Sequence, residues 1–259
     1  MLSHAGCVRE TNQDVVAFML PGGHTDNADA LAIVADGMGG HLSGEIASRM
    51  AADIVLQLYR ELHGELPDVL GRCIEAANTA IYQRSRHEPE CAGMGTTCTV
   101  LALHDGRAFL AHIGDSRAYL LRDGELHQIS EDHSLVAKLV REGTLTSEEA
   151  QRSPQRNVIL RALGSEAQAR PVIWREGLPT QDGDVFVLCS DGLTDVVSAE
   201  VIADIAGRLE PGDACEALLA KSLAEGAPDN VAVGVFAVNH TAAPSDDVRS
   251  TRPISRPVA

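Results

Sequence analysis

Two Asp-Gly pairs in the middle of the chain constrain its fold more than any other feature of the sequence. Asp105-Gly106 separates the apolar runs 98–103 and 108–113, and Asp123-Gly124 follows a further run at 118–121. An Asp-Gly pair between two apolar runs is a strong signal for a two-residue hairpin turn, which joins antiparallel strands. The sequence therefore predicts an antiparallel meander and argues against a doubly wound parallel sheet.

Four helical patterns accompany these strands, two before the meander and two near the end of the chain. The first is expected at about 43–62, with Ile46, Met50, Ile54 and Leu58 on one face, so it should pack on a sheet. The other expected elements are a helix at about 68–86 with the buried stripe Val69, Leu70, Ile74, Ala77 and Ile81, helices at about 198–208 and 213–225, and strands at 15–20, 31–35, 172–175, 185–189 and 231–238.

Two segments carry less regular structure in this interpretation. Residues 135–141 have a helical pattern, whereas 143–156 are polar and resemble a surface insertion. From 239 to 259 the chain is rich in Pro, Ser, Thr, Arg and Asp without an apolar period, so we expect a disordered tail. One catalytic domain over 1–238 followed by this tail is the predicted organisation.

Composition limits the possible partners. A chain of 259 residues with a net charge of -16 argues against nucleic acid or an anionic membrane surface as a partner. No window reaches the roughly 18 apolar residues that a membrane span requires. Six cysteines without a close pair are typical of reduced core residues, which predicts a cytoplasmic protein.

The stretch from Leu31 to His41 joins a buried strand to a helix. Its apolar run 31–35 ends on Asp36, and Gly37, Gly39 and Gly40 should then let the backbone turn tightly. A carboxylate in such a bend could hold a hard cation, and the bend itself could hold a phosphate. The alternative is an ordinary strand-to-helix turn in which the Asp caps backbone amides.

Asp36 is one of four aspartates that lie where an apolar run meets a turn; the others are Asp115, Asp191 and Asp229. If those strand ends converge, the like charges would repel one another strongly without cations. Carboxylates without a Cys/His ligand pattern favour magnesium or manganese over zinc. The sequence therefore predicts a site for hard divalent ions.

Other reactive side chains have simpler explanations. Arg9 and Asp14 flank the first strand and could form a surface ion pair, which would contribute little stability. Cys189 lies inside a strongly apolar run and is interpreted as a core residue, not as a nucleophile. His112 and His133 are likewise interpreted as structural.

Six motifs in order make the chain resemble the metal-dependent protein Ser/Thr phosphatases of type 2C, in their compact bacterial form. The resemblance covers roughly residues 3–238. It implies a four-layer α+β sandwich, with two packed antiparallel sheets flanked by pairs of helices and a mobile flap at about 135–163. The motifs are Val8-Arg9-x-x-Asn12-x-Asp14, Asp36-Gly-Met-Gly-Gly-His41, Gly95-Thr-Thr97, Gly114-Asp-Ser116, Ser190-Asp-Gly192 and Asp229-Asn230.

The same resemblance assigns roles to individual residues. Asp36 would bridge two metal ions, with the carbonyl of Gly37 on one of them and Asp191 and Asp229 completing the pair. Asp115 would hold, with Asp191, the third metal of bacterial members. Arg9 would bind the substrate phosphate and Asp14 would orient metal-bound water, with Asn230 beside the metal ligands.

Phosphate-monoester hydrolysis makes chemical sense of these residue types. The uncatalysed reaction is extremely slow, so a catalyst must both create a nucleophile and neutralise charge. Two cations about 3.5–4 Å apart can share a hydroxide and aim it in line at phosphorus. The guanidinium of Arg9 offers a planar fork that matches phosphate oxygens better than a lysine would.

The chain departs from the family pattern at two positions that concern catalysis. Many eukaryotic members carry a His two residues after the bridging Asp, proposed as the general acid, and this chain has Met38 there. His41 is the nearest replacement, either as an acid or as a hydrogen-bonding residue near the substrate. Bacterial relatives often have a His before the flap proline, where this chain has Ser153.

The leading hypothesis is a manganese- or magnesium-dependent phosphatase of phosphoserine and phosphothreonine in proteins, which opposes a cognate bacterial Ser/Thr kinase. Its expected partners are that kinase and its substrates, and the expected state is a monomer. One alternative is a phosphatase dedicated to a single partner, such as an anti-sigma-factor antagonist. The other is a catalytically silent module that binds metal or phosphopeptide. That module would be expected to have lost a metal-binding aspartate, and the sequence retains them all.

Overall fold

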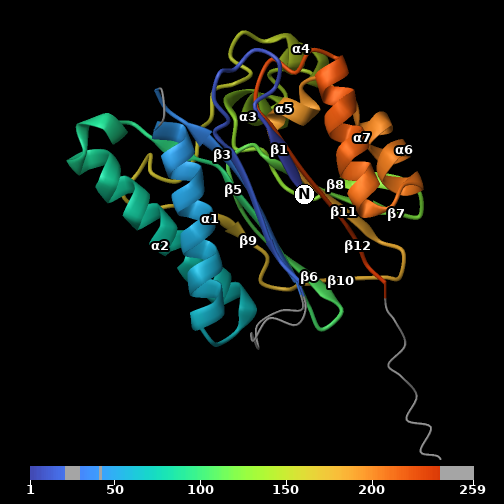
Figure 1. Cartoon of the computed structure of the whole chain (residues 1–259), viewed down its shortest axis with the longest axis horizontal. Coiled ribbons are helices and arrows are strands. Elements are labelled where there is room, and N and C mark those ends of the chain that lie inside the picture. The colour runs from blue at the N-terminus through green and yellow to red at the C-terminus, as the bar shows by residue number, and fades with distance from the viewer. Residues whose placement is uncertain (21–29, 41–42, 240–259) are drawn as a thin grey trace, which may run out of the picture.

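The computed structural model describes residues 1–20, 30–40 and 43–239, and its strands form two antiparallel sheets that pack face to face (Figure 1). The five-stranded sheet has the order β1 (Leu2–His4), β12 (Val231–Ala237), β11 (Val185–Cys189), β7 (Arg117–Arg122) and β8 (Glu125–Gln128). The seven-stranded sheet has the order β10 (Leu178–Pro179), β6 (Arg107–Ile113), β5 (Cys98–His104), β3 (Ala30–Met38) and β2 (Asp14–Met19), with β4 (Gly95–Thr96) beside β3 and β9 (Val172–Ile173) beside β6.

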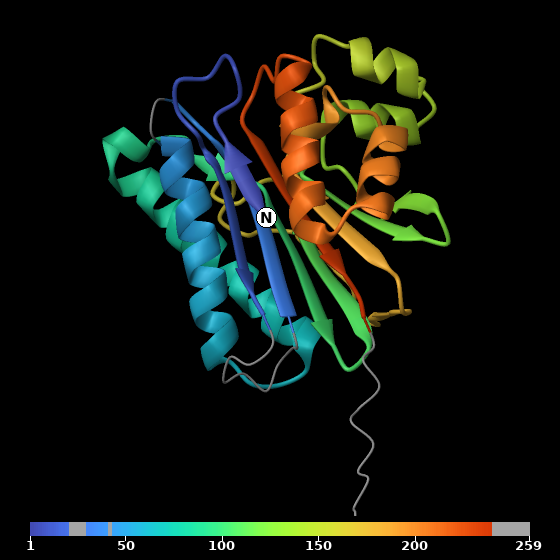
Figure 2. The ribbon, with the colours of Figure 1, turned by 45° about the vertical axis from the view of Figure 1, so that its right-hand side comes forward.

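A pair of helices covers the outer face of each sheet, which confirms the predicted four-layer sandwich. Helices α1 (Ser43–Glu61) and α2 (Leu66–His87) pack on the seven-stranded sheet. Helices α6 (Ala199–Arg208) and α7 (Pro211–Ala224) pack on the five-stranded sheet (Figure 2). The short helices α3 (Leu135–Arg141), α4 (Ser147–Arg152) and α5 (Asp191–Thr194) lie together at one end of the sandwich.

Both predicted Asp-Gly hairpins are present. Asp105 has φ 48° and Asp123 has φ 53°, and each is followed by a glycine that also has positive φ. Positive φ at both central residues defines the turn whose twist matches that of antiparallel strands, and Asp tolerates this conformation better than most residues. The two turns produce two separate hairpins, β5–β6 in the seven-stranded sheet and β7–β8 in the five-stranded sheet, so the single meander predicted from the sequence is wrong.

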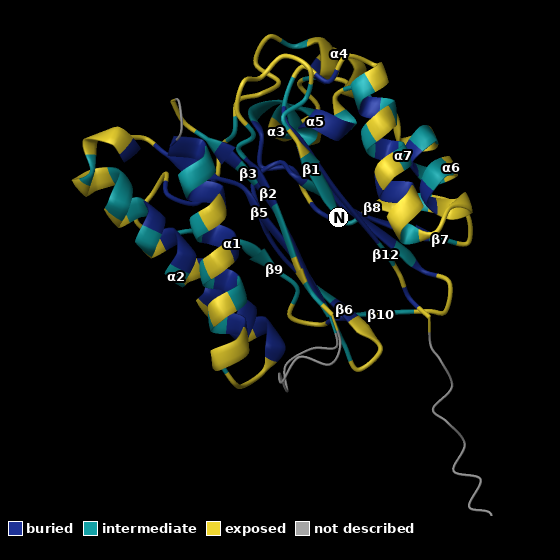
Figure 3. Ribbon diagram, viewed as in Figure 1, coloured by how far each residue is buried: buried dark blue, intermediate teal, exposed yellow. Residues whose placement is uncertain are grey.

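The apolar residues form three layers of core, which Figure 3 shows as dark bands along the inner faces of the helices and along the strands. One cluster lies between the seven-stranded sheet and α1 and α2, and a second lies between the five-stranded sheet and α6 and α7. The third lies between the two sheets and includes Val34, Leu110, Phe186 and Leu188. The whole stripe predicted for α2 is buried.

The predicted face of α1 is displaced by one position. Ala47, Ala51, Val55 and Tyr59 are fully buried, whereas the predicted Ile46, Met50, Ile54 and Leu58 are only partly buried at the edge of the cluster. Small alanine side chains allow a helix to approach its neighbours closely. The larger residues beside them then cover the rim of the contact.

The sequence analysis missed several short elements, among them β1, α4 and α5. Strand β1 was not expected, and it pairs with β12 at the edge of the five-stranded sheet. Helix α4 lies inside the segment interpreted as a polar insertion, and the capping box of Thr146 and Glu149 marks its start. Helix α5 begins at Asp191, immediately after β11. None of the helices described here has both the length and the apolar character that crossing a bilayer requires.

We expect the core between the sheets to dominate stability. Phe186 is fully buried there, so Phe186→Ala should lower the free energy of unfolding by about 3–5 kcal/mol in a urea titration. Phe18→Ala is the control because half of that side chain is exposed, and its loss should be much smaller. Equal losses in the two variants would contradict this assignment of the core.

Candidate active site

The aspartates singled out in the sequence lie close enough that the charges of Asp14, Asp191, Asp115 and Asp229 all act on Asp36. Helix α5 begins at Asp191 and lies with α3 and α4 at one end of the sandwich (Figure 1). Asp14 begins β2 and lies directly opposite Asp36 in β3, in the register of an antiparallel pair. Such opposite residues have β-carbons about 4.5–5.5 Å apart. The hydroxyl of Ser190, just after β11 of the other sheet, donates to Oδ2 of Asp14 over 2.6 Å. The two sheets are therefore joined at the carboxylates.

Asp36 does not end its strand, which corrects the tight turn expected at Gly37. Strand β3 continues to Met38, and Gly37 and Met38 pair with Thr96 and Gly95 of β4. Glycine is needed at position 37 because a β-carbon there would lie 2.1 Å from the carbonyl oxygen of Gly44. The close approach of helix α1 to the strand therefore explains this glycine.

Hydroxyl groups hold the Asp36 backbone in place. The amide of Asp36 donates to Oγ1 of Thr97 over 2.8 Å, and Oγ1 of Thr96 donates to the Asp36 carbonyl over 2.8 Å. Oγ1 of Thr97 lies 2.7 Å from Oγ of Ser116, which immediately follows Asp115. Thr97 therefore fixes the end of β3 relative to the loop that carries Asp115.

Asp229 and Arg9 lie at the margin of this cluster. Arg9 donates from Nη2 to Oδ2 of Asp229 over 2.7 Å, and its side chain remains more than half exposed. The alternative interpretation, a surface pair between Arg9 and Asp14, is therefore wrong about the partner. Arg9 is a cation held beside the carboxylates by an exposed contact, so a competing anion could draw it away.

Asn230 fastens the loop that carries Arg9. Its side chain accepts a hydrogen bond from the amide of Gln13 and donates to the carbonyls of Ala5 and Thr11. Gly6 lets this loop lie close, since it has φ 77° and a β-carbon there would lie 2.1 Å from the Asp229 carbonyl oxygen. The hydrogen bonds of Asn230 and the close approach at Gly6 thus hold residues 5–13 against the start of β12.

Burial and mutual repulsion raise the pKa of these carboxyl groups. Burial, followed by the negative charges of neighbouring aspartates, raises the pKa of Asp14 to about 7 and that of Asp115 to about 8. The pKa of Asp191 is raised to about 6, by burial and then by the charges of Asp195 and Asp229. For Asp36, burial and the charges of Asp14, Asp191, Asp115 and Asp229 raise the pKa well above its ordinary value.

The donor set fits hard cations. Asp36 lies within hydrogen-bond reach of both Asp14 and Asp191, and the buried oxygens Asp14 Oδ1 and Asp115 Oδ1 have no hydrogen-bond partner. Over the described ranges, no group of three or more His, Cys, Asp or Glu side chains is already arranged to hold a metal ion. The carboxylates are gathered, but Arg9 and Ser190 engage two of them. Binding of an ion would therefore require these side chains to reorient.

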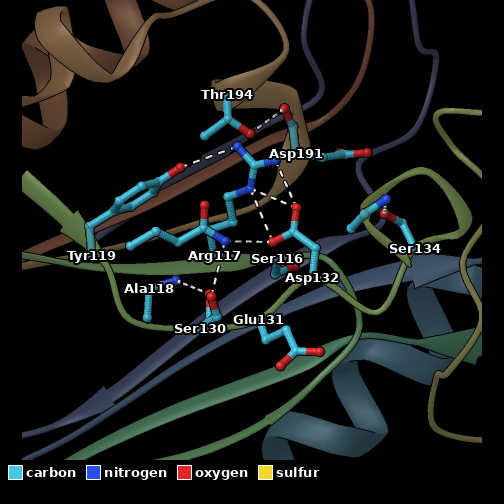
Figure 4. Close-up of polar contacts among 12 residues, drawn as sticks. Ser116, Arg117, Ala118, Tyr119, Ser130, Glu131, Asp132, Ser134, Asp191 and Thr194 are labelled. Carbon is cyan, nitrogen blue, oxygen red and sulfur yellow. Dashed lines mark hydrogen bonds and ion pairs between the residues drawn. The ribbon is translucent and has the colours of Figure 1, made fainter. Parts of the chain in front are cut away.

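The sequence analysis missed an ion pair between Arg117 and Asp132 beside the carboxylate cluster, which we name the clasp (Figure 4). Arg117 donates to Oδ2 of Asp132 from Nε over 2.9 Å and from Nη2 over 2.7 Å. Its Nη1 donates to the hydroxyl of Tyr119. Gln128 donates to Oδ1 of Asp132 over 2.7 Å. This pair ties β7, next to Asp115, to the segment that leads into α3. The sequence offered only one signal, an Arg placed two residues after a candidate ligand.

A groove of about 740 Å³ extends from Asp115 and Asp191 between α3 and α4 on one side and α5 and the start of α6 on the other. Its arginines are paired: Arg117 with Asp132, Arg141 with Glu131 and Arg156 with Asp195. The carboxylates therefore open onto a surface large enough for part of a polypeptide.

Three other predicted residues have clear outcomes. Cys189 is fully buried in β11, where burial raises the pKa of its thiol to about 12, so it is a core residue. His112 and His133 are buried and stack on each other with ring centroids 5.0 Å apart, as structural residues would. His41 lies outside the described residues.

Comparison with known proteins decides the family. Residues 8–225 match the family described as protein phosphatase 2C. The chain belongs to the protein phosphatase 2C family. It is 42% identical over 234 residues to the serine/threonine protein phosphatase PstP of Mycobacterium tuberculosis, which covers 90% of this chain and 43% of PstP. The chain thus spans less than half the length of that relative.

A further relative and a solved catalytic domain are each similar along nearly their whole length. Protein phosphatase PhpP of Streptococcus pneumoniae is 37% identical over 245 residues, covering 92% of this chain and 96% of PhpP. A crystal structure of the PstP catalytic domain in complex with two manganese ions has a TM-score of 0.78 and 39% identity, covering 92% of this chain and 96% of that one.

The raised pKa values predict how stability depends on pH in a chelator. An aspartyl group whose pKa is raised on folding contributes stability below its ordinary pKa near 3.8, and loses it as pH rises through the folded value. Without divalent ions, the melting temperature should fall between pH 5 and pH 8, as Asp191, Asp14 and Asp115 ionise. Calorimetry with EDTA measures this, and manganese should raise the melting temperature more at pH 8 than at pH 5.

The matched controls for that experiment are two Asp→Asn changes. Asp36→Asn removes one charge from the cluster and should flatten the pH dependence in EDTA, whereas Asp105→Asn, at an exposed turn, should leave it unchanged. A melting temperature that rises from pH 5 to pH 8 in the unaltered chain would contradict the electrostatic account.

Proposed function

We propose that this chain hydrolyses phosphoserine and phosphothreonine esters in proteins, with Mn²⁺ or Mg²⁺ as cofactor. The observation that carries the proposal is the gathering of Asp14, Asp36 and Asp191 from both sheets into one self-repelling cluster. Membership of the 2C family supports the reaction, and the two manganese ions in the PstP structure support the cofactor.

The proposed metal ligands are those that the resemblance to the family implies, and the gathering of the carboxylates supports them. Asp36, the carbonyl of Gly37, Asp191 and Asp229 would hold two ions, with Asp36 shared between them. Asp115 and Asp191 would hold a third ion, which the unpartnered oxygen of Asp115 supports. When bound, the ions would lower the pKa of a coordinated water and neutralise charge on the phosphate.

The chain's own residues would bind and orient the substrate. Arg9 would leave Asp229, once metal neutralises that carboxylate, and present its planar fork to two phosphate oxygens. Asp14 would orient a metal-bound water through its oxygen Oδ1, while Ser190 fixes its other oxygen. Asn230 would keep the Arg9 loop in register. Met38 cannot transfer a proton, so His41 remains the proposed replacement, either as an acid or as a hydrogen-bonding residue near the substrate.

The proposed partners are phosphorylated proteins, among them a Ser/Thr kinase and its substrates, and we propose a cytoplasmic monomer. The groove between α4 and α5 supports a polypeptide substrate. The segment 135–163, which contains α3 and α4, is proposed as the flap that borders it, within a catalytic domain over 1–238. The named relatives favour a phosphatase over a silent binding module, and phosphatase activity toward a single dedicated partner remains an outcome of substrate screening.

Hydrolysis of a phosphothreonine peptide tests the function directly. Phosphate release should require manganese or magnesium and should stop in EDTA. Asp229→Asn should lower kcat by about two to four orders of magnitude, because a ligand charge is lost, while the circular dichroism spectrum stays the same. An unaltered chain that binds manganese but releases no phosphate would favour the silent module.

Arg9→Ala should mainly raise KM for the phosphopeptide, by about tenfold, since a charge-assisted bidentate contact contributes about 1.5–3 kcal/mol. The KM of Arg9→Lys should fall between that of the unaltered chain and that of Arg9→Ala, because a lysine keeps the charge but lacks the planar fork of a guanidinium. Arg175→Ala is the matched control, as Arg175 pairs with Asp68 on α2. A KM unchanged in Arg9→Ala would remove Arg9 from the phosphate site.

A further inference from the structure

A second pocket, of about 430 Å³, lies between the end of α2 and the segment 159–165, and it shares no lining residue with the groove of α3–α5. We name it the Arg86–Arg161 pocket. Its walls are the last turns of α2, with Tyr82, Ser85 and Arg86, and the segment 159–165, with Arg161. Met38 and Gly95, at the paired ends of β3 and β4, complete it.

The pocket is connected to Asp36 through a single strand. Leu163 exchanges two backbone hydrogen bonds with Thr96 in β4, at 3.1 and 2.9 Å, and the hydroxyl of Thr96 donates to the Asp36 carbonyl. Met38 lies two residues beyond Asp36, which is about 7 Å at the rise of a strand. An extended peptide with its phosphate at Asp36 would reach the pocket with a residue about two to four positions away.

The pocket is positively charged on a strongly acidic protein. It contains Arg86 and Arg161, and no acidic residue of the described chain lines it. Among the described residues, no ion pair or hydrogen bond joins the side chain of either arginine to another residue. In the groove of α3–α5, by contrast, each arginine is already paired with a carboxylate.

Structural roles do not account for both arginines. Arg86 lies in the last turn of α2, where a cation is favourable beside the negative end of the helix. Arg161 lies outside any described helix, and its positive charge is one of the causes that lower the pKa of His133, which is an unfavourable interaction. Its charge therefore lacks a partner that the described chain supplies.

We propose that the Arg86–Arg161 pocket binds an anionic side chain of the substrate, a carboxylate or a second phosphate, two to four residues from the phosphorylated residue. This proposal rests on the proposed function. The arginines supply the charge, and Leu160 and Met38 supply apolar surface for the stem of that side chain. The chain thus selects phosphorylated segments that are acidic on one side.

Three kinds of phosphothreonine peptide, all of equal length, test this proposal. One has alanines on both sides, the second has aspartates two to four residues from the phosphothreonine, and the third has a non-hydrolysable phosphonate there. Each acidic peptide is made with the anion on either side. With manganese at low ionic strength, kcat/KM should be about fivefold higher with an anion on one side, which is the upper range for an exposed ion pair.

Substitutions locate the effect. Arg86→Gln and Arg161→Gln should each reduce the preference, and the double variant should abolish it, while hydrolysis of p-nitrophenyl phosphate stays unchanged. Arg72→Gln is the matched control: it is exposed on the same helix, 14 residues and therefore about 21 Å from Arg86. If the phosphonate raises kcat/KM more than the aspartates do, the preferred anion is a second phosphate. If the aspartates raise it more, the preferred anion is a carboxylate.

The outcomes separate this proposal from the proposed function. Equal kcat/KM for all three peptides, with normal turnover of p-nitrophenyl phosphate, would overturn the pocket and leave the phosphatase intact. A preference that survives in the double arginine variant would overturn it as well. No turnover of any substrate with manganese would instead reject the proposed function.

Discussion

Mutual repulsion among buried carboxylates is the constraint on which the rest of this structure depends. Asp14, Asp36, Asp115 and Asp191 lie together at one end of the sandwich, and burial and shared negative charge raise the pKa of each. Such a cluster lowers the stability of the folded chain at neutral pH unless cations neutralise it. The large apolar clusters on both sides of each sheet supply the stability that keeps it in place.

The carboxylates are held by hydroxyl and amide groups that belong to neighbouring strands. Thr97 and Ser116 link Asp36 to the Asp115 loop, and Ser190 links the two sheets through Asp14. Rigid strands therefore set the positions of the central aspartates. Asp229 differs, because its partner Arg9 comes from an exposed loop that can exchange one anion for another. The same two residues thereby connect the proposed metal site to the proposed phosphate site.

Two surfaces of different charge border the cluster. The groove beside α3, α4 and α5 contains arginines that are already paired, and the clasp of Arg117 and Asp132 fixes its inner wall (Figure 4). The Arg86–Arg161 pocket offers two arginines whose side chains have no ion-pair partner among the described residues. A substrate bound at the cluster would therefore meet a neutralised surface in the groove and an attractive one at the pocket. Long-range repulsion from a chain of net charge -16 would make that local attraction useful for acidic substrates.

The sequence by itself determined the two Asp-Gly hairpins, the four large helices and the aspartates, because hairpin turns, helical periodicity and strand ends are local properties of the chain, whereas it did not show that the hairpins belong to different sheets. It misplaced the buried face of α1 and expected a turn at Gly37, where a strand continues. Only the tertiary structure decided that Arg9 contacts Asp229, that Ser190 supports Asp14 and that Arg117 is clasped by Asp132. Those contacts join residues 220, 176 and 15 positions apart, and no local pattern specifies which distant partner a side chain meets when sheets and loops pack.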